Sequence, residues 1–128
     1  FSKLHEARTL SYLNISACEL TELPASISSL ENLKSLLAYK NYISDISNTI
    51  LPNCIERISL YRNRICNNTL QLDYCDRLQE INLGANPIIN MTLYVSPKLH
   101  TLKIRARYIK KSIIIVANQK TTICISED

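Results

Sequence analysis

Residues 10–20 read LSYLNISACEL, and this stretch decides which fold we expect for the chain. Its apolar residues follow the frame LxxLxLxxCxL, where L stands for Leu or Ile, and the same frame returns four more times. The copies begin at residues 10, 33, 55, 78 and 99, which gives intervals of 23, 22, 23 and 21 residues. A repeat of this length is the signature of a solenoid. The sequence therefore predicts one repeat-solenoid domain over residues 1–128.

Each copy predicts one short strand, because apolar and polar residues alternate in its LxL part and only one face of a strand is buried. The strands are expected near residues 12–15, 35–38, 57–60, 80–83 and 101–104, stacked as a parallel sheet, and a partial sixth copy begins near residue 120. The frame predicts that these residues are buried: Leu36, Ile58, Leu60, Ile81 and Leu83.

A small polar residue ends the frame in most copies. Cys18 holds this position in the first copy and Arg107 in the fifth, and the other three have Asn41, Asn63 and Asn86. The asparagine side chains are expected to form a ladder that hydrogen-bonds free backbone groups where the chain leaves the strand.

The other half of each repeat must return the chain to the next strand. Leu23, Ile27 and Leu30 have helix-like spacing behind Pro24, which suits a first helical position. Pro52 argues against a regular helix in the next return. The sequence thus predicts an irregular, short-helical convex side. Residues 1–9 match the end of a preceding repeat, and because terminal repeats need polar caps, we expect a fragment of a longer chain.

Composition argues against several classes of protein. The five cysteines include no CxxC pair, which favours buried free thiols in an intracellular, cytoplasmic setting. His5 and His100 fall into no catalytic motif, and no apolar run approaches a membrane span of about 18 residues. We therefore predict no enzyme activity, cofactor, metal or membrane span. A secreted protein is the alternative, because three Asn-x-Ser/Thr triplets begin at Asn14, Asn67 and Asn90.

The frame from Leu10 to Leu33, with its Leu23-Pro24 pair, resembles the typical short intracellular leucine-rich repeats. These include the Ras-associated type of signalling scaffolds and fungal adenylate cyclases. The resemblance covers the whole chain as a fold, although only this repeat keeps the Leu-Pro signature. It implies a curved horseshoe that binds proteins on its concave parallel sheet, with a Ras-like small GTPase as the most specific partner class.

Residues between the core positions are expected to face the concave side. There Tyr39 and Tyr61 share one column on neighbouring repeats, and Lys40 and Arg62 share another. Tyr and Arg are enriched at binding hot spots, although Tyr is also favoured by strands in general. The fifth copy adds His100, Thr101, Lys103, Arg105 and Ala106 to this side. The predicted partner-binding residues are Leu37, Tyr39, Lys40, Arg57, Tyr61 and Arg62.

These residues predict a non-catalytic protein–protein interaction scaffold. The formal net charge of +4 and the basic rim of the predicted site favour an acidic protein partner. One alternative is an RNA-associated module that uses Lys40, Arg57, Arg62, Lys103 and Arg105. Another is a regulatory segment of a larger enzyme. Salt dependence separates the protein scaffold from the RNA-associated module, because phosphate binding weakens steeply with salt.

Overall fold

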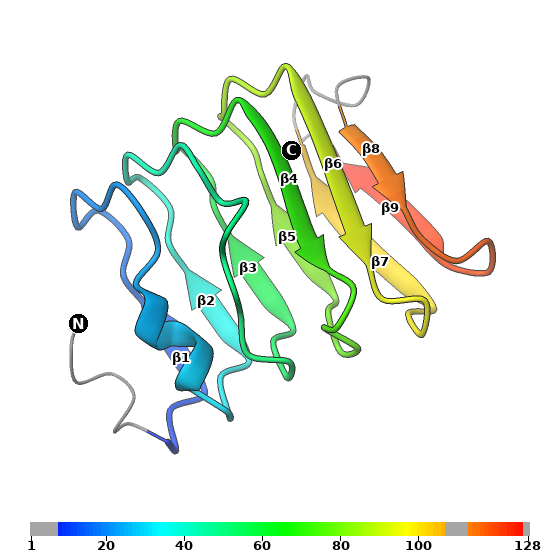
Figure 1. Cartoon of the computed structure of the whole chain (residues 1–128), viewed down its shortest axis with the longest axis horizontal. Helices are drawn as coiled ribbons and strands as arrows, with labels where there is room; N and C mark the ends of the chain where they lie inside the picture. The colour runs from blue at the N-terminus through cyan, green and yellow to red at the C-terminus, as the bar shows by residue number, and fades with distance from the viewer. Residues whose placement is uncertain (1–7, 107–112, 127–128) are drawn as a thin grey trace.

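The chain winds into a parallel β-solenoid of about five turns (Figure 1). The structure is a computed structural model that describes residues 8–106 and 113–126. One strand per turn joins a six-stranded sheet in which neighbouring strands run parallel. All five expected strands are confirmed, and the partial sixth copy supplies the last. In sheet order the strands are β1 (Tyr12–Asn14), β2 (Ser35–Leu37), β3 (Arg57–Ser59), β5 (Glu80–Asn82), β7 (Thr101–Arg105) and β9 (Thr122–Ser126).

The return side differs from the expected short helices. Its one helical segment in the described residues is the 3₁₀ helix η2 (Ala25–Ser29), and Pro24, predicted as the first helical residue, is its N-cap. Later returns instead form a second parallel sheet of β4 (Asn67–Leu72), β6 (Asn90–Val95) and β8 (Ile113–Val116). Alternate residues of β4 and β6 are buried, which is the pattern of a half-buried strand. These returns therefore do not form the helical convex side that was expected of a horseshoe.

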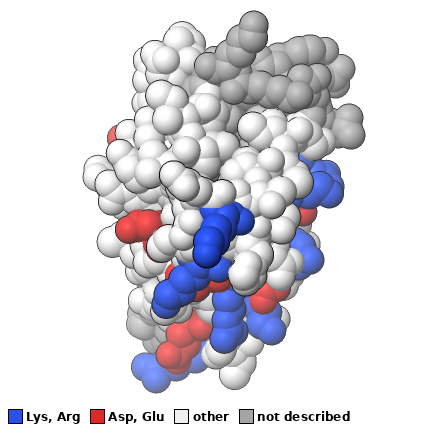
Figure 2. Space-filling view, turned by 90° about the vertical axis from the view of Figure 1, so that its right-hand side faces the viewer, with Lys and Arg blue, Asp and Glu red and all other residues white. Residues whose placement is uncertain are grey.

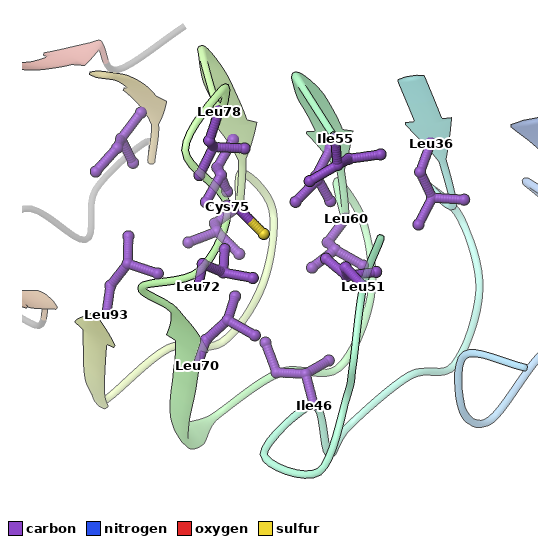
Figure 3. Close-up of a cluster of buried hydrophobic side chains, with 14 of the residues drawn as sticks. Leu36, Ile46, Leu51, Ile55, Leu60, Leu70, Leu72, Cys75, Leu78 and Leu93 are labelled. Carbon is purple, nitrogen blue, oxygen red and sulfur yellow. The ribbon is translucent and has the colours of Figure 1, made fainter. Parts of the chain in front are cut away.

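The hydrophobic core fills the space between the two sheets. The five residues predicted to be buried expose 2% of their surface or less. Figure 3 shows Leu70 and Leu72 of β4 pointing into the same interior as Leu60 from the six-stranded side. Cys75 is also fully buried there, in the core position that Leu30 holds two returns earlier. Each turn therefore contributes apolar residues from both of its halves.

The asparagine ladder is confirmed. Asn63 Oδ1 accepts a hydrogen bond from the Ile43 amide (3.1 Å), while Nδ2 donates to the carbonyls of Ala38 (3.0 Å) and Leu60 (2.9 Å). Asn41 and Asn86 repeat this pattern one turn before and after. Each amide thus connects two consecutive turns of the solenoid.

The two ends of the ladder differ from its middle. Cys18 is exposed, and its thiol donates only to the Ser16 carbonyl two residues earlier (3.3 Å). It therefore does not replace the asparagine, although its amide donates to Asn41 Oδ1 (2.9 Å). Arg107 lies outside the described residues.

The register of the fifth copy corrects the sequence frame. That frame aligns Leu102 with Ile81 at an interval of 21, whereas the structure pairs Ile104 with Ile81 at an interval of 23. As a result Ala106 is fully buried and does not lie on the outward face where the frame placed it. The cause is local: the turn after β6 is two residues shorter than its predecessor, and β7 is two residues longer than β5.

Candidate interaction surface

The outward face of the six-stranded sheet is made of rows that cross its strands. Strand pairing defines the rows, and equivalent positions on neighbouring strands are about 4.8 Å apart. One row contains Tyr12, Ser35, Arg57, Glu80, Lys103 and Cys124. The next row contains Asn14, Leu37, Ser59, Asn82, Arg105 and Ser126. Side chains in these rows alternate with buried core residues and therefore face away from the interior.

Tyr39 and Tyr61 lie side by side just beyond the ends of β2 and β3. The amide of Lys40 donates to the Tyr61 carbonyl (2.9 Å), which ties the two turns together at this point. The Tyr39 amide donates to Ser16 Oγ (3.1 Å), which ties it to the previous turn as well. Tyr39 is half-buried and Tyr61 is 37% exposed. The predicted aromatic column is therefore contiguous.

Lys40 and Arg62 adopt left-handed backbone angles, with φ of 55° and 56°. Ala17 and Ala85 occupy the equivalent positions in neighbouring turns with φ of 54°. Such angles cost roughly 1 kcal/mol or more outside glycine, so their fourfold recurrence is imposed by the repeat. Lys40 and Arg62 are both exposed, and the Arg62 guanidinium lies 5.9 Å from the centre of the Tyr61 ring.

All six predicted partner-binding residues lie on β2, β3 and the turns that follow them. Leu37 is half-buried between Asn14 and Ser59, and Arg57 is exposed in the neighbouring row. We call the six residues the aromatic–basic patch. It combines three apolar or aromatic side chains with three basic ones, and it contains no acidic residue.

Gly84, the one glycine in the sequence, leaves space for Tyr61. Its φ is not positive, so its backbone angles do not demand glycine. A Cβ at this position would lie 3.1 Å from Tyr61 Cδ1 and 3.1 Å from Asn82 Oδ1. Because Gly84 has no side chain, the Tyr61 ring can lie over this position of the next turn.

Gly84→Ala should move the Tyr61 ring while changing stability by less than about 1 kcal/mol, because the entropic gain of alanine is about 0.4–1 kcal/mol and offsets the close contact. The ring is exposed enough to shift. Proton NMR of the Tyr61 ring and a urea titration measure the two effects. Ser59→Ala, one row away, is the control. An unmoved ring with unchanged shifts would contradict the packing described above.

One ion pair lies on the C-terminal part of this face. Arg105 Nε lies 2.7 Å from Glu80 Oε1 on the neighbouring strand. Figure 2 shows basic and acidic side chains interspersed at the end of the molecule that carries β8 and β9. Of the five basic residues considered for RNA, Arg105 is therefore neutralised. Among the described residues, Lys40, Arg57 and Arg62 form no ion pair, although Glu80 lies opposite Arg57 in the strand register.

One aromatic contact beyond the patch was not predicted. The Arg64 guanidinium lies 4.4 Å from the centre of the Tyr42 ring, one turn apart. Both residues follow a ladder asparagine by one position, so their spacing of 22 residues could have indicated the contact. The contact extends the aromatic and basic character past the ladder.

Two of the free cysteines, Cys54 and Cys75, have structural roles. Burial, with a contribution from neighbouring Asp76, raises the pKa of the Cys75 thiol to about 12, so the thiol stays protonated at neutral pH. The Cys54 thiol donates to the Leu33 carbonyl (3.0 Å). Across residues 8–106 and 113–126, no three His, Cys, Asp or Glu side chains are grouped to hold a metal ion, and no helix is long and apolar enough to cross a membrane.

Comparison with known proteins adds no assignment. No protein-family profile matches the chain, and no curated protein matches it in sequence. The function is therefore argued from the surface itself.

Proposed function

We propose that this chain is a non-catalytic interaction module of the short leucine-rich-repeat type, within an intracellular, cytoplasmic protein. It binds an acidic protein surface through the aromatic–basic patch on the six-stranded sheet. The single observation that carries this proposal is the contiguity of the patch. Tyr39 and Tyr61 lie on neighbouring turns, with Lys40 and Arg62 directly after them in the chain.

The two kinds of side chain in the patch have different roles. The tyrosines and Leu37 supply area that a partner buries, and rigid aromatic side chains are typical hot spots. Lys40, Arg57 and Arg62 are exposed, and such rim charges mainly accelerate association with an oppositely charged surface. This division favours a protein partner, because RNA binding requires phosphate contacts along a longer basic track.

The repeat frame supports the choice of partner class. Its resemblance to Ras-associated leucine-rich repeats makes a Ras-like small GTPase the first candidate, in a signalling scaffold. The asparagine ladder and the parallel sheet are consistent with that repeat type, and the strand-backed returns set this chain apart from members with helical ones. In a longer protein, the same patch can serve to regulate an attached enzyme.

Replacing either tyrosine tests the proposal. Tyr39→Ala or Tyr61→Ala should weaken binding by about 1–3 kcal/mol, chiefly through faster dissociation, because buried aromatic contacts are lost. Lys40→Ala should slow association and lose its effect at high salt. A candidate GTPase, or a partner recovered by pull-down, is titrated against each variant by surface plasmon resonance.

Ser29→Ala, on the return side, is the matched control and should bind as the unchanged chain does. The proposal fails if both tyrosine variants bind normally while Ser29→Ala does not. An RNA-binding module would behave differently. Its affinity would fall steeply and log-linearly with salt, and Lys103→Ala would matter as much as Lys40→Ala.

A further inference from the structure

A groove separates two consecutive return segments on the side of the solenoid away from the aromatic–basic patch. One wall is the segment that contains η2, and the other is the return that follows β2 (Figure 1). The cavity between them has a volume of about 350 Å³. This lies at the lower end of the roughly 300–1,000 Å³ typical of ligand sites. It can therefore hold a pair of side chains.

The groove opens where two kinds of return meet. η2 makes its backbone hydrogen bonds within itself, from Ile27 to Pro24 (3.1 Å) and from Leu30 to Ile27 (3.0 Å). The next return instead forms hydrogen bonds with β4 and with the residues that follow it. Asn68 Oδ1 accepts from the Ile46 amide (2.8 Å), and the Tyr74 hydroxyl accepts from the Leu51 amide (2.9 Å). The lining residues of each wall therefore make their bonds away from the groove, and the two returns are joined further along, where the Cys54 thiol donates to the Glu31 carbonyl (2.9 Å).

The floor of the groove is apolar, while Thr21, Ser28, Asn48 and Thr49 add polar groups to its lining. Ile27 and Leu51 are buried, with 1% and 4% of their surface exposed. Leu23 and Pro24 are half-buried on the η2 wall. Ile50 lines the opposite wall and leaves 67% of its surface exposed. An apolar side chain entering the groove would cover part of Ile50 and gain the contacts of the other four.

The rim of the groove is acidic in a chain whose net charge is positive. Glu22 and Asp45, one from each wall, line it and are exposed. The surrounding sequence reinforces the sign of the charge, because residues 19–33 and 41–56 contain five acidic side chains and no Lys or Arg. The groove therefore favours a cation, whereas the aromatic–basic patch favours an anion.

We propose that this groove binds a short peptide segment of a partner protein in which an apolar side chain stands next to an arginine or a lysine. The apolar side chain contacts Ile27 and Leu51, while the cation lies between Glu22 and Asp45. The site is independent of the proposed function, because it uses other residues, another side of the solenoid and a partner surface of opposite charge.

The minimal probe is acetyl-leucyl-arginine amide, titrated into the isotopically labelled chain by NMR. Backbone shifts should change at groove residues such as Ser28 and Thr49. The citrulline analogue has the same shape without the charge, and it should bind about 2–5-fold more weakly, the range of an exposed ion pair. Acetyl-glycyl-arginine amide should bind about tenfold more weakly or worse, because it lacks the buried leucine side chain.

Two variants test the groove itself. Glu22→Gln combined with Asp45→Asn should abolish the preference for arginine over citrulline while keeping the leucine-dependent part of binding. Asp45 Oδ1 accepts a hydrogen bond from the Ser47 amide (2.9 Å), and the amide oxygen of the substituted side chain can still accept it, so the local turn is preserved. Ala25→Phe, at an exposed lining position, should fill the groove and block all three peptides.

Gln71→Ala, on the exposed face of β4, is the control and should leave the titration unchanged. The proposal is overturned if no shift changes at millimolar peptide, if the changes map to the six-stranded sheet, or if citrulline and arginine peptides bind equally well. It is also overturned if Ala25→Phe binds normally. None of these results would affect the proposal for the aromatic–basic patch, whose variants are different.

Discussion

Asn63→Ala should lower the free energy of unfolding by about 2–6 kcal/mol, since a buried amide left without a partner costs about 1–3 kcal/mol and each of two further lost hydrogen bonds costs about 0.5–1.5 kcal/mol. The substitution leaves the Ile43 amide without an acceptor and removes one of two side-chain donors from each of the Ala38 and Leu60 carbonyls, which keep their bonds from Asn41 and Asn86. Asn63 is only 7% exposed, so water cannot easily replace the missing side chain. Urea unfolding followed by circular dichroism measures the loss.

One further variant separates the accepted bond of Asn63 from its donated bonds, and a second variant serves as a control. Asn63→Asp keeps an acceptor for the Ile43 amide but loses both donated bonds, so it should also be strongly destabilising at neutral pH. Asn53→Ala replaces an exposed asparagine and should stay within about 0.5 kcal/mol of the unchanged chain. If Asn63→Ala were as harmless as Asn53→Ala, the ladder would not hold consecutive turns together.

Leu60→Ala should cost roughly 2–5 kcal/mol, the range for truncating a buried leucine. Leu60 exposes 2% of its surface and lies in the middle of the core between the two sheets. Because each turn contacts only its neighbours, damage at the centre should also uncouple the two ends. Hydrogen exchange should then show β1 and β2 opening with a different free energy from β7 and β9.

Ser59→Ala is the matched control, because the neighbouring residue on β3 faces outward. It should change stability little and leave the exchange pattern uniform. Equal stability of Leu60→Ala and Ser59→Ala would mean that the repeat register is wrong. A large loss with uniform exchange at both ends would instead mean that the solenoid unfolds as one unit.

Much of the six-stranded sheet could be predicted because its signal repeats. No single LxxLxL means much in a chain rich in Leu and Ile, but five copies in one frame define the strands and the buried residues. The asparagines at positions 41, 63 and 86 could be predicted as a ladder for the same reason. The return side could not, because its segments differ from one another in both length and pattern.

The second sheet was not predicted, because only helical spacing of the apolar residues was considered for the return segments. Leu72 and Cys75 are three residues apart, which matches the helical pattern, but Leu70 and Leu72 alternate as in a strand. Met91, Leu93 and Val95 alternate in the same way on β6. Pairing with an adjacent parallel strand decided between the two patterns, and that pairing is invisible within any one segment.

The candidate site was predicted where the frame is regular and misjudged where it is not. Copies two and three are nearly identical in length, so the aromatic–basic patch could be assembled from the sequence. In the fifth copy, a shorter turn and a longer strand cancel in length, and the sequence frame placed Ala106 on the wrong side. The space that Gly84 leaves for Tyr61 depends on three-dimensional contact and has no signal in the frame.

The change from a helical to a strand-like return also determines how the solenoid bends. A 3₁₀ helix is wider than a strand, so we expect η2 to widen the return side of the first turns relative to their sheet side. From β4 onward, both sides are hydrogen-bonded strands and advance by the same distance, about 4.8 Å per turn. Because both sides advance equally, we expect these turns to stack straight. Additional turns of this kind would lengthen a flat rod, and its outward face would meet a partner along a line instead of enclosing it.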